Sequence, residues 1–263
     1  MSAKIKRPPP NPHIQRIRAS EAYNAVKLTP SCWALKEAPA EKSASSGRKE
    51  CRLRGVRRIL EQRLWPSYDY HLAERLNPTP SSMRVRTGVR NARQGTKRGS
   101  AVHEQLHAIA VHGLLGAEAM YAKRHIEIEP LVVLLIQHFY REGLRLVEAE
   151  LPVHDASEPL RVGSSIDLVC ERKDNQKHVL IELKVGGDNY FKKASGAMEA
   201  EFTPYNIPNS PLNKALVQLL AYRLLFERCY ANVVPRDSVD SYRVIFLGES
   251  GVVHRVLLSL IHI

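Results

Sequence analysis

Two carboxylates and a lysine stand inside a stretch of sequence that otherwise has the apolar character of two buried strands. Asp167 lies in the first run and Glu182 in the second, with Lys184 two residues further on. Alternate side chains of a strand share a face, so Glu182 and Lys184 point to the same side of the sheet. Strands disfavour Asp in their interior unless something binds it. Carboxylates beside a lysine are the groups that hold a divalent cation and stabilise negative charge next to it.

The turn between the two strands decides whether the carboxylates meet. A turn centred on Asp174 and Asn175 places Asp167 directly opposite Glu182, with about 4.5–5.5 Å between their Cβ atoms. Two carboxylates at that separation repel each other unless a cation lies between them. Residues 173–177 could instead form a longer loop, and a slip of one residue would break the pairing. The sequence predicts a metal site that depends on this register.

The elements around this hairpin follow from the spacing of apolar residues and from helix start signals. Ser210 and Pro211 supply an N-cap and a proline at the first helical position. The expected elements are helices over 100–123 (with a possible break at Gly113 or Gly116), 131–143 and 210–229, and strands over 145–153, 162–172, 178–185, 241–247 and 252–261. Helices that alternate with strands predict an α/β fold.

Positive charge is concentrated at the start of the chain. The 263 residues carry 39 Lys/Arg and 27 Asp/Glu, a net charge of +12, and residues 1–100 hold 22 and 7 of these. We therefore expect a basic, partly disordered and partly helical extension over 1–93, followed by the main domain over 94–263. Residues 77–98 are expected to be loop-like. Such a charge distribution predicts a polyanionic partner, above all nucleic acid, with a solubilising or import segment as the alternative.

Other features of the sequence narrow the class of protein. Four cysteines at positions 32, 51, 170 and 229 include no Cys-x-x-Cys pair, which argues against an iron–sulfur cluster or a zinc ribbon. Free thiols predict a reducing, intracellular compartment. No apolar run approaches 18 residues, so we expect a soluble protein with no membrane partner. The basic first 20 residues would suit the nucleus or mitochondrion in a eukaryotic or viral protein, and the cytoplasm is expected otherwise.

The order of the elements, together with four short motifs, resembles the PD-(D/E)XK nuclease core in its RecB-like exonuclease branch. The motifs are RGSAVHEQL (98–106), GSSID (163–167), IELK (181–184) and QLLAY (218–222). The resemblance covers residues 99–222 and extends to phage- and herpesvirus-type alkaline exonucleases and to mitochondrial genome-maintenance exonucleases. It implies a restriction-endonuclease-like core over 94–263, with a central mixed sheet flanked by helices. The iron–sulfur members of this branch need four cysteines at positions that this chain lacks.

The resemblance implies an Mg²⁺- or Mn²⁺-dependent deoxyribonuclease that acts on DNA ends or single strands in replication, repair or recombination. The metal ligands that it implies are His103, Asp167, Glu182 and the backbone carbonyl of Leu183. Lys184 would orient the attacking water and stabilise charge. Glu150 would take the extra acidic position of the family, for which Glu148 on the same face is the rival. Gln218 and Tyr222, four residues apart on one helix, would position the phosphate strand or Lys184.

A competing motif overlaps the first of these elements. The stretch HEQLH has the His-Glu-x-x-His pattern of zinc metalloproteases, in which His103 and His107 would bind the metal and Glu104 would act as general base. The metzincin spacing offers no third ligand, although Glu127 or Glu129 could supply one. A third alternative is a catalytically inactive DNA-binding protein on a nuclease fold.

Overall fold

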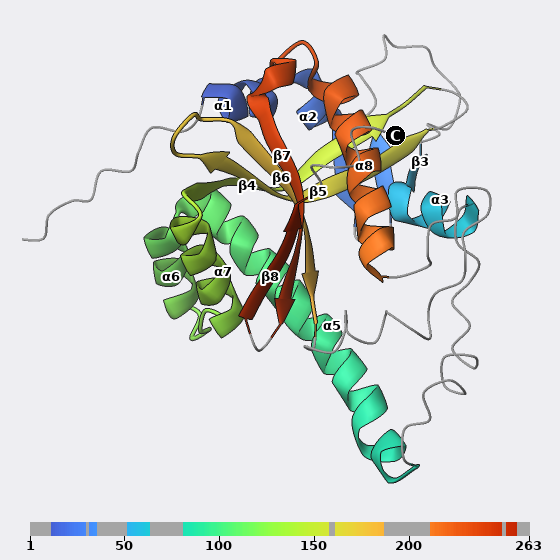
Figure 1. Cartoon of the computed structure of the whole chain (residues 1–263), viewed down its shortest axis with the longest axis vertical. Helices are drawn as coiled ribbons and strands as arrows, with labels where there is room; N and C mark the ends of the chain where they lie inside the picture. The colour runs from blue at the N-terminus through green and yellow to red at the C-terminus, as the bar shows by residue number, and fades with distance from the viewer. Residues whose placement is uncertain are drawn as a thin grey trace, which may run out of the picture.

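In the computed structural model (Figure 1), an eight-stranded sheet with parallel and antiparallel neighbours is flanked by helices. The structure describes residues 12–29, 32–35, 52–63, 81–157, 161–186, 211–248 and 251–256. The prediction of an α/β class with a mixed sheet between helices is therefore confirmed.

The sheet is centred on β5, which has neighbours on both sides. Its main strands are β4 (Leu144–Asp155), β5 (Val162–Arg172), β6 (His178–Val185), β7 (Val239–Gly248) and β8 (Gly251–Val256), side by side in this order. All these neighbours are antiparallel except β6 and β7, which run parallel because α8 (Pro211–Tyr230) lies in the crossover between them. The start of β5 also pairs in parallel with β3 (Arg52–Gly55), and β3 leads through β2 (Cys32–Leu35) to β1 (Val26–Thr29).

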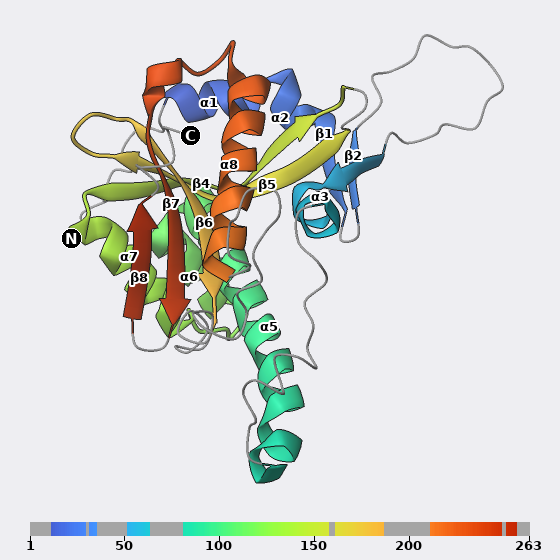
Figure 2. The same ribbon diagram turned by 45° about the vertical axis from the view of Figure 1, so that its right-hand side comes forward.

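Helices cover both faces of the sheet (Figures 1 and 2). One face packs against α5 (Ser81–His112), α6 (Leu114–Ala122) and α7 (Pro130–Arg141), and the other packs against α8, α1 (Pro12–Ala19), α2 (Glu21–Ala25) and α3 (Val56–Arg63). Gly113, with a φ of 73°, separates α5 from α6 at one of the two glycines where a break was expected. The buried apolar residues form two main clusters, one that includes α5, α6 and α7 and one that includes α1, α3 and α8. These clusters lie on opposite sides of β5, so this strand is buried on both faces.

The long helix α5 begins earlier than the sequence suggested. Residues 77–98 were expected to be loop-like, and the structure has a helix from Ser81 onward, so that prediction is wrong. No proline occurs between Pro80 and Pro130, so none interrupts this helix. The glycines at positions 88 and 95 cost only about 1 kcal/mol each inside a helix. The first half of α5 projects from the body of the molecule (Figures 1 and 2).

The described part of the N-terminal 93 residues shares the core of the rest. Ile14 and Ile17 of α1 and Val56 of α3 are buried in one cluster with Tyr222 of α8. Ile14 and Ile17 are three residues apart, which puts them on one face of their helix. The boundary expected between residues 93 and 94 lies inside α5, and both sheet and core continue across it.

The β5–β6 hairpin has the predicted register. Leu168 pairs with Ile181, and the turn begins at Lys173, as expected for a turn centred on residues 174 and 175. The ladder ends at the Leu168 pair, so Asp167 and Glu182 lie where the two strands separate. Asp167 Oδ2 fills part of this opening by accepting a hydrogen bond of 2.7 Å from the backbone N–H of Leu183 in β6.

The alternation of faces along β5 also breaks at Asp167. Ile166 packs in the cluster with α8, whereas Leu168, two residues on, packs in the cluster with α5 and α7. A regular strand would place both on one face. The irregular backbone therefore presents Asp167 at an opening of the sheet instead of within the packed surface of a continuous ladder.

Candidate metal centre

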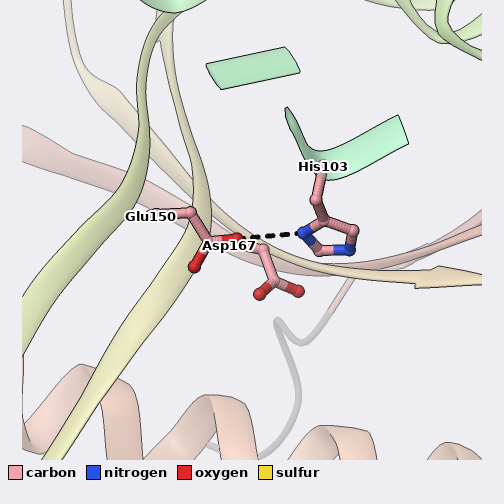
Figure 3. A group of neighbouring side chains, drawn as sticks. All are labelled: His103, Glu150 and Asp167. Atoms are coloured by element: carbon pink, nitrogen blue, oxygen red, sulfur yellow. Dashed lines mark hydrogen bonds and ion pairs between the residues drawn. The ribbon is translucent and has the colours of Figure 1, made fainter. Parts of the chain in front are cut away.

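Three side chains from three elements meet beside this opening (Figure 3). His103 of α5, Glu150 of β4 and Asp167 of β5 each offer a ligand atom within 4.8 Å of the other two. His103 Nδ1 lies 3.0 Å from Glu150 Oε1. All three are partly exposed, so an ion can reach them from solvent, and the described ranges hold no other such group of three. Two carboxylates and an imidazole suit a divalent cation.

Glu150 reaches this group through an unusual backbone conformation. Its φ is 54°, in the left-handed region that costs a residue with a side chain about 1–3 kcal/mol. Ala149 and Leu151 on either side of it pack on opposite faces of the sheet, although they are two residues apart. Their partners in β5 flank Asp167, so the breaks in β4 and β5 lie at the same level of the sheet. The paired breaks bring the two carboxylates together.

The Glu150 carboxylate is held by two neighbours. Ser165 Oγ donates a hydrogen bond of 2.6 Å to Oε2, and His103 lies on Oε1. Burial opposes ionisation of Glu150, but the hydrogen bonds with His103 and Ser165 outweigh it and lower the pKa of the carboxyl. Glu150 is therefore an anion at neutral pH. Sequence reasoning missed Ser165 as its partner, since register alone places that serine opposite Lys184.

Glu148, the rival for the extra acidic position, is placed elsewhere. It is 1% exposed, and its Oε2 lies 2.5 Å from Arg18 Nε of α1, on the other side of the sheet. In a regular strand the two glutamates would share a face, and the left-handed backbone conformation at Glu150 separates them. The structure therefore brings Glu150, and not Glu148, to the group that can hold a metal.

Glu182 lies next to the three candidate ligands in drier surroundings. The residue is 1% exposed, its Oε1 accepts a hydrogen bond from Lys184 Nζ, and its Oε2 is buried without a hydrogen-bond partner among the described residues. Burial and the neighbouring Asp167 carboxylate raise the pKa of Glu182 to about 8. Burial and the Glu150 charge raise the pKa of Asp167 to about 7. A buried carboxylate oxygen without a partner, beside two more carboxylates, fits a bound cation.

Leu183 and Lys184 of the IELK motif contact the same carboxylates. The Lys184 side chain is 24% exposed and contacts Glu182. Burial opposes its charge, but the Glu182 and Asp167 carboxylates outweigh this and raise the pKa of the Lys184 ammonium, which is therefore charged at neutral pH. The backbone N–H of Leu183 binds Asp167 while its side chain is buried in the core. That the Leu183 carbonyl also binds a metal stays a prediction.

Gln218 and Tyr222 of α8 form a buried pair behind the site. Gln218 Nε2 donates a hydrogen bond to the Tyr222 hydroxyl, and Ser164 Oγ of β5 donates another of 2.9 Å. Burial, followed by the charges of Glu182 and Asp167, raises the pKa of Tyr222 well above its usual value. The pair therefore lies within electrostatic range of the carboxylates and ties α8 to β5, which suits a positioning role.

The other two residues of HEQLH that the zinc alternative needs, Glu104 and His107, do not belong to the candidate group of three ligands. His107 Nδ1 lies 3.4 Å from a backbone carbonyl oxygen of β4, and Glu104 lies beside Tyr121 of α6. Glu129 is one possible third zinc ligand, and its Oε2 lies 3.4 Å from Arg98 Nε. No group of three ligands within the described ranges contains both histidines of the motif. The arrangement favours the reading in which only His103 binds metal.

Comparison with known proteins adds no assignment. No protein-family model matches the chain, and no match is found among curated protein sequences. Among the helices that the structure describes, none is both long enough and apolar enough to span a bilayer. The function has to be argued from the geometry of the site.

Proposed function

We propose that this protein is a divalent-metal-dependent DNA nuclease with a PD-(D/E)XK core, which hydrolyses phosphodiester bonds at DNA ends or in single strands. The observation that carries the proposal is the convergence of His103, Glu150 and Asp167 beside the Glu182–Lys184 pair. His103, Asp167 and the Glu182–Lys184 pair belong to three of the four motifs that resemble the RecB-like branch, and Glu150 belongs to β4. The preference for ends or single strands follows from that resemblance alone.

Each residue has a role in this proposal. His103, Glu150, Asp167 and Glu182, with the carbonyl of Leu183, would hold Mg²⁺ or Mn²⁺. When bound, such a cation supplies positive charge beside the scissile phosphate and acidifies water. The Lys184 ammonium, fixed by Glu182, adds a point charge that a phosphate oxygen can contact and that can orient the attacking water. Gln218 and Tyr222 keep β5 in place through Ser164.

The experiment compares end-labelled linear DNA with covalently closed circular DNA, in the presence of Mg²⁺ or Mn²⁺. Wild-type protein should degrade the linear DNA and spare the circle. Asp167→Asn and Glu182→Gln should abolish cleavage, because each removes a negative ligand, and should leave DNA binding nearly intact. Asp174→Asn is the matched control, since it makes the same change at an exposed turn of the same hairpin.

Other outcomes would reject the proposal in distinguishable ways. Cleavage by Asp167→Asn at the wild-type rate would remove the nuclease assignment. DNA binding without cleavage in either metal would indicate an inactive DNA-binding protein. Stoichiometric zinc that is lost on His107→Ala would favour the zinc protease alternative.

A further inference from the structure

Two basic segments adjoin the elements of the candidate metal centre. Residues 52–63, which form β3 and α3, carry five arginines and one glutamate. Residues 81–98, the first half of α5, carry six Lys/Arg and no acidic residue. Together the two segments carry a net charge of +10, whereas residues 99–263 are slightly acidic. Both segments lead to the candidate metal centre.

The first segment is tied to the strand that carries Asp167. Gly55 at the end of β3 pairs with Gly163, directly before the rest of the GSSID motif in β5. The next residues form α3, whose apolar side packs in the same cluster as Tyr222 through Val56, Ile59 and Leu60. Arg57 and Arg58 lie on its exposed side. Arg57 follows Gly55 by two residues, and Gly55 pairs with Gly163, four residues before Asp167, so the start of α3 lies close to the strand that carries this ligand.

The second segment is continuous with the helix that supplies His103. At a rise of about 1.5 Å per residue, the backbones of residues 98 and 84 lie about 8 and 28 Å along the axis from residue 103. Lys97, which directly precedes Arg98 at the end of this basic segment, is exposed. Figures 1 and 2 show that this half of α5 extends beyond the sheet, whereas α3 lies beside β3 and α8. Each of the two basic elements is therefore joined to an element that carries a candidate metal ligand, α3 to β5 and the first half of α5 to the turn of the helix with His103.

We propose that the DNA backbone reaches the metal centre between α3 and the first half of α5, with Arg57 and Arg58 binding phosphates next to the scissile bond and Lys97 binding one further along. The inference rests on the proposed function, because it assigns the substrate path to that site. A planar guanidinium binds two phosphate oxygens at once, which suits the positions nearest the reaction. With about 3.4 Å between phosphates, the basic part of α5 spans about two to eight nucleotides from the metal centre.

The first test removes charge from α3. Arg57→Gln/Arg58→Gln is compared with Lys123→Gln/Arg124→Gln, which removes the same two charges from an exposed pair at the end of α6. Binding of labelled DNA is measured over a series of KCl concentrations without divalent metal. Each lost phosphate contact lowers the slope of log affinity against log salt concentration by about 0.7–0.9. The slope should therefore fall by about one to two for the α3 variant and should not change for the α6 control. Arg57→Lys/Arg58→Lys should restore most of the slope.

Steady-state cleavage adds a second readout. The α3 variant should raise KM several-fold with little change in kcat, because it removes ground-state contacts with the phosphate backbone. An unchanged salt slope, or equal losses in the α6 control, would overturn the inference. The same slopes measured with Asp167→Asn keep the two proposals apart. If that variant still cleaves, the nuclease assignment fails while the slopes still decide where DNA binds.

A third test uses DNA length. Affinity should rise as one end of the substrate is extended, and it should level off at about eight nucleotides beyond the cleaved bond, where the basic part of α5 ends. Lys97→Gln should weaken long substrates and leave the shortest ones unaffected. Affinity that does not depend on length would show that α5 is not part of the path.

Discussion

The carboxylates of the metal centre differ in how strongly they hold a proton. Hydrogen bonds with His103 and Ser165 lower the pKa of Glu150, whereas burial and neighbouring charge raise the pKa of Asp167 to about 7 and that of Glu182 to about 8. At pH 7 without a cation, part of the Asp167 population and most of the Glu182 population are therefore protonated. A cation that binds both must displace those protons.

Cation binding should therefore release protons and weaken as the pH falls. Between pH 8 and pH 6 the fraction of both carboxyls that is ionised decreases, so the affinity for Mn²⁺ should fall steeply across this window. Calorimetric titration in buffers with different ionisation enthalpies measures the number of protons released at pH 7. Glu182→Gln should release fewer. Mn²⁺ binding with no proton release at pH 7 would contradict this account of the site.

The two histidines of HEQLH should differ in their effect on DNA cleavage. His103→Ala removes a group that lies 3.0 Å from Glu150 and should reduce cleavage by at least 10²-fold, while His107→Ala and Glu104→Gln should change it less than threefold. Both control residues are exposed and lie on the same helix. Cleavage rates of the three variants, with the metal content of each, provide the measurement. Equal loss in all three would favour the protease reading.

At the scale of one element, the conformation of β4 makes a prediction about stability. An ordinary strand position is destabilised when Ala is replaced by Gly, by about 0.5–1 kcal/mol. Glu150 has a φ of 54°, which only glycine adopts without strain. Glu150→Gly should therefore be more stable than Glu150→Ala by about 1 kcal/mol in urea denaturation, although both lose cleavage. At Val153, a regularly paired position of the same strand where φ is not positive, the order of the Gly and Ala variants should be reversed.

A buried histidine in β6 gives a pH-dependent prediction for the fold. His178 is 0% exposed, neither ring nitrogen has a hydrogen-bond partner among the described residues, and burial followed by the nearby His13 lowers its pKa to about 4. Histidine in the unfolded chain binds a proton at about pH 6.5, so protonation of His178 favours the unfolded chain. This residue therefore leaves the free energy of unfolding unchanged above pH 6.5 and lowers it as the pH falls from 6.5 towards 4. The loss at pH 5 amounts to about 2 kcal/mol.

The variant His178→Phe isolates this effect. Its urea midpoint should change less between pH 7 and pH 5 than that of the wild-type protein, by the equivalent of about 2 kcal/mol. Lys177→Gln serves as the control for a change at a neighbouring position outside β6. The same pH dependence in wild type and His178→Phe would mean that the histidine does not remain neutral in the folded protein.

The sequence predicts β4 to β8 well because their signals are local, whereas β1, β2 and β3 lie in the extension that was expected to be partly disordered and partly helical. Alternation fixes β5 and β6, and the Asp174–Asn175 turn fixes their register. It does not predict the breaks at Glu150 and Asp167, which arise from pairing and packing across the sheet. The choice between Glu148 and Glu150 depends on the left-handed backbone conformation at Glu150, which no motif encodes. The resemblance names candidate residues on several elements, and the structure brings His103, Glu150 and Asp167 of these together.

At the scale of the whole molecule, the N-terminal residues combine two functions that a deletion would remove together. Ile14, Ile17 and Val56 lie in the core, whereas Arg57 and Arg58 lie on the surface next to the metal centre. Loss of residues 1–93 would take away β3 and buried side chains as well as charge. Weaker DNA binding by the truncated chain would therefore not show whether charge or folding was responsible.

Point substitutions separate the two contributions. Ile17→Ala creates a cavity in a fully buried position and should cost about 2–4 kcal/mol of unfolding free energy, with no change in the salt dependence of DNA binding under conditions where the protein stays folded. Arg57→Gln/Arg58→Gln should do the reverse, because exposed charges contribute little to stability but each phosphate contact contributes to the slope. Urea denaturation and DNA titrations in KCl, carried out on both variants, give the four measurements. If Ile17→Ala leaves stability unchanged, α1 does not belong to the core. If the arginine variant loses stability and keeps its slope, α3 is structural and the positive charge near the metal centre does not bind DNA.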